Sequence, residues 1–154
     1  MNLWQKFETE RGLKADNKGI FFHYEKGIDD DLRKACILFA KWLRRRYIFP
    51  VRLNVYIKNC EKVRLLNGIM AYGSFRWFEK RTPYIRIPSK IESDLLNEFS
   101  KEEIYEQILS SLVHELTHYF QWVIDLEQSD AASERQANYY RYRIIEKYYQ
   151  EDIA

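Results

Sequence analysis

The sequence lacks most of the features that mark a membrane or secreted protein. No apolar run approaches the roughly 20 residues that a membrane-spanning helix needs, and the N-terminal residues contain no apolar core of a signal peptide. There are two cysteines, Cys36 and Cys60, far apart in sequence, and we expect Cys36 to be a buried, reduced thiol. These absences together predict a cytoplasmic protein with no membrane contact.

The chain also has no surplus of one charge sign and no low-complexity segment. Its 25 basic and 23 acidic residues give a formal net charge of +2, which argues against binding to nucleic acid through bulk electrostatics. A basic cluster between Lys41 and Arg52 is interpreted as a solvated helix end rather than a phosphate-binding patch. The length of 154 residues predicts one domain, 1–154, in which residues 1–27 form an arm whose structure the sequence does not define.

The spacing of apolar residues predicts an α+β fold. A helix is expected from about Asp30 to Arg46, where apolar residues recur every three or four positions until Pro50 prevents continuation. Alternating patterns predict strands at residues 51–58, 69–78 and 84–88, with a candidate fourth strand at residues 20–24. Two helices follow, one opened by a capping box at Ser100 and ending near Asp125, the other from Ser129 or Asp130 to about Gln150.

Two prolines, Pro83 and Pro88, bracket the strand at residues 84–88. Proline is confined to edge strands and strand ends, so we expect this strand at the edge of the sheet. An edge strand has unpaired backbone groups that can bind an extended peptide. The predicted substrate-binding residues are therefore Tyr84, Ile85, Arg86 and Ile87.

Residues 114–118 read His-Glu-Leu-Thr-His, an HExxH motif inside the long predicted helix. Residues four apart lie on one helix face, so His114 and His118 can bind the same metal ion. Glu115 lies beside that line, where it can take a proton from a water whose pKa zinc lowers toward about 7. The alternative is a chance match with two ordinary polar histidines, and the capped, periodic helix around the motif favours the metal site.

A catalytic zinc ion takes three protein ligands, so the motif leaves one to find. A histidine or aspartate six residues after His118 is excluded, because that position is Ile124. Glu134 is the preferred third ligand because it lies at the start of the next helix, which can fold back after a short loop. The rival ligands are Asp125, Glu127, Asp130 and His23.

The HExxH motif followed by Glu134-Arg135-Gln136-Ala137-Asn138 resembles the gluzincins, zinc peptidases with two histidine ligands and one glutamate ligand. It is most similar to the small ImmA/IrrE-type metallopeptidases, in which Ala-Asn or Ala-Asp follows the glutamate. A weaker resemblance, through Gln121-Trp122, is to the SprT-type zinc proteases, which use a third histidine that is absent after His118. The gluzincin resemblance implies a minimal zincin-like fold: a twisted sheet of three to four strands on an N-terminal helix and the HExxH helix, then a glutamate-bearing helix.

Two further roles are expected around the metal. Asn138 lies one turn beyond Glu134, where it can accept a hydrogen bond from a ligand imidazole, His114 being preferred. The oxyanion of a peptidase reaction also needs a stabilising group. The unranked candidates for it are Tyr72, Tyr139, Tyr142 and His23, with a structural or surface role favoured for His23.

Together these patterns predict a metallopeptidase with one Zn²⁺ ion, which hydrolyses peptide bonds in an intracellular protein or peptide. An alternative is a zinc-bearing protein-binding module of zincin fold with little or no hydrolytic activity. Glu115 argues against that alternative, because a structural zinc site does not need it. A third hypothesis is a metal-free interaction domain. The chain shows no DNA-binding or sensor module, and the sequence does not identify the substrate.

Overall fold

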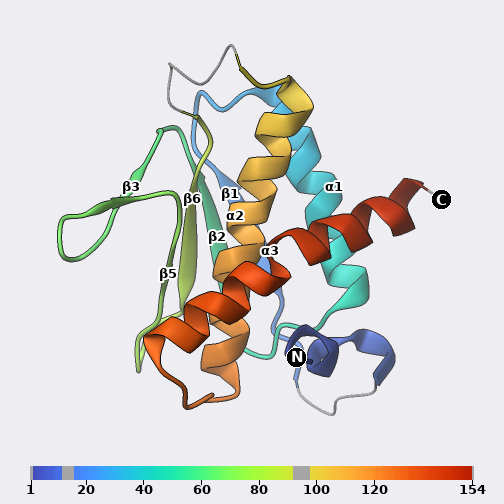
Figure 1. Cartoon of the computed structure of the whole chain (residues 1–154), viewed down its shortest axis with the longest axis vertical. Helices are drawn as coiled ribbons and strands as arrows, with labels where there is room; N and C mark the ends of the chain where they lie inside the picture. Colours follow the sequence, from blue (N-terminus) through green and yellow to red (C-terminus); the bar gives the residue numbers. More distant parts are fainter. Residues whose placement is uncertain (1, 12–15, 92–97, 154) are drawn as a thin grey trace.

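The computed structural model describes residues 2–11, 16–91 and 98–153, in which three α-helices pack on a four-stranded sheet (Figure 1). The α-helices are α1 (Asp30–Arg46), α2 (Lys101–Val123) and α3 (Asp130–Ile153). The strands are β1 (Ile20–Tyr24), β2 (Leu53–Lys58), β3 (Val63–Arg64), β4 (Met70–Ala71), β5 (Ser74–Arg76) and β6 (Tyr84–Pro88). Two short 3-10 helices, η1 (Trp4–Phe7) and η2 (Thr9–Arg11), precede them. The predicted α+β fold is confirmed.

The helix boundaries follow the capping signals in the sequence. Asp29 accepts a hydrogen bond from the backbone N–H of Leu32 at the start of α1. At the start of α2, Ser100 and Glu103 each bond to the backbone of the other, which completes the predicted capping box. α1 has its predicted bounds, and α3 ends at Ile153 rather than near Gln150.

The main sheet has the order β1-β2-β6-β5, with β1, β2 and β6 parallel and β5 antiparallel to β6. In β2, Leu53, Val55 and Ile57 are buried, and the residues between them are half-buried. This alternation arises because one face of the sheet lies against the helices. Ile85 and Ile87 of β6 continue the same buried face. The candidate strand at residues 20–24 is confirmed as β1.

The strand predicted at residues 69–78 is wrong as a single element. β4 pairs with β3 in a separate hairpin that projects from the body (Figure 1), whereas β5 pairs with β6. The chain changes partner at Gly73, where a β-carbon would lie 3.2 Å from both Cδ1 of Ile87 and Cγ of Glu115. Alternation in the sequence does not reveal such a break, because strands of two and three residues leave almost no periodic signal.

The predicted edge position of the strand at residues 84–88 is also wrong. β6 lies between β2 and β5, and it is β5 that forms the edge of the sheet. Pro88 fits an inner strand because it is the last residue of β6, beyond the register that pairs with β5. Strand addition at Tyr84, Ile85 and Arg86 is therefore excluded, because these residues pair on both sides, and the side chain of Ile87 is buried. The edge position from which these four residues were predicted to bind substrate is therefore corrected, because the edge strand is β5.

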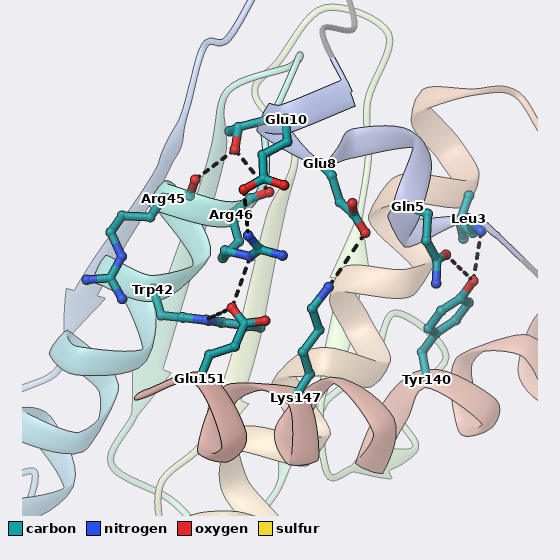
Figure 2. Close-up of polar contacts among 11 residues, drawn as sticks. Leu3, Gln5, Glu8, Glu10, Trp42, Arg45, Arg46, Tyr140, Lys147 and Glu151 are labelled. Carbon is teal, nitrogen blue, oxygen red and sulfur yellow. Dashed lines mark hydrogen bonds and ion pairs between the residues drawn. The ribbon is translucent and has the colours of Figure 1, made fainter. Parts of the chain in front are cut away.

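The N-terminal arm is part of the core. Trp4 is 1% exposed, and its indole N–H donates to Oγ1 of Thr117, inside the HExxH motif, at 3.0 Å. Figure 2 shows the arm joined to α3: the N–H of Leu3 donates to the hydroxyl of Tyr140 at 2.7 Å, and Lys147 pairs with Glu8. Residues 12–15 of the predicted arm lie outside the described residues.

Two other expectations concern the helices and the cysteines. In the described part of the chain, no helix is long and apolar enough to cross a membrane. Cys36 is a fully buried free thiol on α1, as predicted, and burial raises its pKa to about 12. Cys60 is also a free thiol.

Candidate metal centre

α2 and α3 bring three potential metal ligands together. His114 and His118, one turn apart on α2, have their Nε2 atoms 3.3 Å from each other. Glu134, near the start of α3, has Oε2 at 3.1 Å from Nε2 of His114 and Oε1 at 2.9 Å from Nε2 of His118. The short connection between the helices lets α3 fold back across α2 (Figure 1). This brings the carboxylate of Glu134 into contact with both imidazoles.

The spacing of these donor atoms fits one zinc ion. Tetrahedral ligand bonds of about 2.0–2.2 Å place donor atoms roughly 3.3–3.6 Å apart. The separation of 3.3 Å between the two Nε2 atoms matches that range, whereas the two oxygens of Glu134 lie somewhat closer, one at 3.1 Å from His114 and the other at 2.9 Å from His118. Two imidazoles and one carboxylate are also a donor set of catalytic zinc sites, in which a fourth position is left for water or substrate.

His118 is oriented by Gln121, one turn further along α2. Nδ1 of His118 lies 2.8 Å from Oε1 of Gln121, so that a proton on Nδ1 can be donated to this oxygen and Nε2 would be left free to bind a metal. The amide of Gln121 in turn donates to the carbonyl of Ser133 at 3.1 Å and to Oε1 of Gln136 at 2.8 Å. These bonds fix the ring and join the end of α2 to the start of α3, beside Glu134.

Asn138 lies beside His114, as its position one turn after Glu134 predicts. Burial lowers the pKa of His114, and His118 and Arg141 add to this lowering, whereas Glu134 and, to a smaller extent, Asn138 raise it. Nδ1 of His114 is buried and makes no bond of full hydrogen-bond geometry among the described residues. The predicted hydrogen bond between Nδ1 of His114 and Asn138 is therefore not formed in this structure.

Glu115 is a buried carboxylate next to this cluster. It is 7% exposed, and its Oε2 has no hydrogen-bond partner among the described residues. Ligand atoms of His114, Glu115 and His118 all lie within 4.8 Å of one another. Burial raises the pKa of Glu115 to about 7, Glu134 adds to the rise, and His118 and Arg141 oppose it. An unpartnered carboxylate in a low-dielectric site is suited to accept a proton.

The cluster opens into a groove of about 750 Å³. One wall is formed by β5 and the residues beside it, including Gly73, Phe75 and Trp77, and the other by the ends of α2 and α3. β5 is the edge strand of the sheet, so the groove runs between that edge and the HExxH helix.

The rival ligands are placed less well. Asp125 and Asp130 line the groove, but no contact joins either of them to a histidine in the described structure, and Glu127 is exposed outside the groove lining. His23 lies on β1, at the opposite edge of the sheet from β5, where its Nε2 lies 3.0 Å from Oδ1 of Asn54. Glu134 alone among these candidates contacts both histidines.

Of the tyrosines considered for the oxyanion, Tyr72 lines the cavity of about 130 Å³ that also contains His114 and Glu115. Tyr139 lies under the guanidinium of Arg143, and the hydroxyl of Tyr142 donates to Gln107.

Gln121, Gly73 and Arg141 were not predicted to act at the site. Arg141 lines that same cavity and lies seven residues after Glu134, on the face that also carries Asn138. The seven-residue spacing of Arg141 from Glu134 and the three-residue spacing of Gln121 from His118 could have identified both residues from the sequence, because residues at these spacings lie on one helix face. Gly73 has no such signal, because its contact is made across the fold.

The comparisons with known proteins add no support to these inferences, which rest on the residues described above. No protein-family model matches the chain, and searches of curated proteins and of solved structures gave no match either. The resemblance to gluzincins therefore stays a prediction that rests on two short motifs.

Proposed function

We propose that this chain is a zinc-dependent metallopeptidase that hydrolyses peptide bonds in a cytoplasmic protein or peptide. The proposal is supported chiefly by the convergence of His114, His118 and Glu134, whose donor atoms lie 2.9 to 3.3 Å apart although Glu134 comes from a different helix. The carboxylate of Glu134 supplies the third ligand that HExxH alone lacks. The ligands would be the two Nε2 atoms and the carboxylate of Glu134.

The position of each side chain indicates its role in the proposed reaction. Bound zinc supplies a Lewis acid that polarises a carbonyl and lowers the pKa of water. Glu115 accepts the proton of the water that attacks the scissile carbonyl and returns it to the leaving amine as the C–N bond breaks. Gln121 holds the ring of His118, and Gly73 leaves space beside Glu115. The substrate would lie extended along β5, the edge strand that borders the groove.

Metal analysis and a matched pair of variants test the proposal. The purified protein is expected to hold one equivalent of zinc and to cleave casein or quenched peptide pools. Glu115→Gln should keep the zinc and lower the turnover rate by about 10²–10⁴-fold, the usual contribution of a general base. Glu102→Gln, an exposed change on the same helix, is the control. A protein that binds no zinc contradicts the proposal, and zinc binding with no cleavage of any pool would favour the protein-binding module.

A further inference from the structure

Two cavities continue the metal-site groove along α2. The first, of about 130 Å³, shares its Gly73, His114 and Glu115 walls with the groove. The second, of about 400 Å³, shares Tyr72, Ser111 and Arg141 with the first. Successive cavities therefore share walls and adjoin one another, from the metal site to the larger cavity.

The larger cavity is mostly apolar. Its walls include Pro88, Ile91, Phe99, Ile104 and Ile108. A volume of 400 Å³ falls within the range of about 300–1,000 Å³ of cavities that bind small molecules or side chains. Such walls favour an apolar occupant, because a polar group would lose its water there without gaining hydrogen bonds.

Arg141 stands where the two cavities meet. Its Nε donates to Oγ of Ser110 and its Nη2 to Oγ of Ser111, both at 3.1 Å. Its charge also acts on Glu115, whose pKa it lowers, but among the described residues its hydrogen bonds and ring contact go to these neutral hydroxyls and Tyr142, and no carboxylate lies at ion-pair distance. A guanidinium held in place by hydroxyls keeps its positive charge available to an oxygen of a ligand.

We infer that the larger cavity selects a large apolar side chain of the substrate, flanking the scissile bond, while Arg141 binds a backbone oxygen of the same peptide. The oxygen belongs either to an internal carbonyl or to a C-terminal carboxylate, which share this chemistry. Lys90 also lines the cavity, so two cations disfavour a basic side chain. The inference rests on the proposed function for its substrate class, but it concerns binding and not hydrolysis.

Peptide binding to the metal-free protein tests this directly. The probes are fluorescent octapeptides of glycine and serine with one central Phe, Leu, Gly, Glu or Lys, each made with an amidated and with a free C-terminus. Anisotropy should show the Phe or Leu peptide binding at least about tenfold more tightly than the Gly peptide, as burial of one large apolar side chain implies. Equal affinity for Phe and Gly peptides, or preference for Glu or Lys, overturns the inference.

Variants assign the effect to the cavity. Ile104→Trp should fill it and remove the preference for Phe over Gly, and Ile104→Ala, which enlarges it, should keep that preference; both are checked by circular dichroism. Arg141→Gln should weaken binding about tenfold, whereas Arg143→Gln, on the same helix with its guanidinium over Tyr139, should not. Loss confined to free C-termini identifies a terminal carboxylate, and loss for both forms identifies a carbonyl. A preference that survives Ile104→Trp in the folded variant, or unchanged binding by Arg141→Gln, overturns the inference.

The binding result separates the two proposals. An active zinc enzyme without side-chain preference would overturn this inference and leave the peptidase standing. A protein that prefers apolar side chains but binds no zinc and hydrolyses no peptide would support this inference and contradict the peptidase proposal.

Discussion

Gly73 packs directly against Glu115: a β-carbon at position 73 would lie 3.2 Å from Cγ and 3.6 Å from Cδ of the glutamate. Glu115 is buried, so a methyl group added at position 73 would press on its side chain. The backbone between β4 and β5 thus sets the position of the proposed base relative to the histidines.

The first prediction follows from this contact. Gly73→Ala should lower the turnover rate by roughly 10–100-fold, because small displacements of a reacting group have effects of that size. Zinc content should not change, since no ligand touches Gly73. Gly68→Ala is the comparison: Gly68 has φ +85° and a β-carbon there would meet no atom within 4 Å, so that variant should lose about 1–2 kcal/mol of stability and keep its activity. Equal activity of Gly73→Ala and the wild type would contradict the argument.

The second prediction concerns the third ligand. Glu134→Ala should lose its zinc at a chelator concentration at least about 100-fold lower than the wild type does. This exceeds the roughly 10–100-fold loss of affinity that is typical when a residue hydrogen-bonded to a ligand is changed. Glu127→Ala, an exposed glutamate in the α2–α3 connection, is the matched control and should retain zinc normally. Similar zinc retention by both variants would exclude Glu134 as a ligand.

The third prediction tests the residue that orients His118. Gln121→Met keeps the size of the side chain but removes the acceptor for Nδ1 of His118, and should weaken zinc binding by about 10–100-fold. Gln128→Met removes a bond to the same Gln136 without touching a histidine, so its zinc affinity should be unchanged. Chelator competition measures both, and identical affinities would refute the orienting role.

The fourth prediction links the site to stability. The Oε2 atom of Glu115 is buried without a partner among the described residues, and an unsatisfied buried charge is costly. In chelator, Glu115→Gln should therefore raise the free energy of unfolding by at least about 1 kcal/mol, since function and stability conflict at such positions. Denaturant melts of wild type, Glu115→Gln and the exposed Glu102→Gln provide the measurement. A less stable Glu115→Gln protein would show that the carboxylate has a structural partner.

The fifth prediction concerns the N-terminal arm. Tyr140→Phe would leave the buried N–H of Leu3 without its acceptor and should cost about 1–3 kcal/mol of stability (Figure 2). Tyr139→Phe changes the neighbouring residue, whose ring and not its hydroxyl makes the contact with Arg143, and should stay within about 0.5 kcal/mol. Equal denaturation midpoints would mean that the arm contributes little to the position of α3.

The sequence determined the local features of the protein. The bounds of α1, the capping box of α2 and the period of β2 follow from interactions within a few residues, and each was predicted. The same holds for His114 and His118, because a helix places residues four apart on one face. Glu134 was predicted from its position at the start of a helix after a short loop.

Only the tertiary structure decided which strands are neighbours. The prolines around β6 suggested an edge, yet a three-residue strand, β5, covers it, and so short a strand leaves almost no periodic signal. The split of residues 69–78 into β4 and β5 depends on Gly73 approaching Glu115 and Ile87, residues distant in sequence. The contacts of Arg141 with Ser110 and Ser111 likewise form only when α3 lies across α2. Sequence periodicity encodes which face of an element is buried, whereas the partner of that face is fixed by packing of the whole chain.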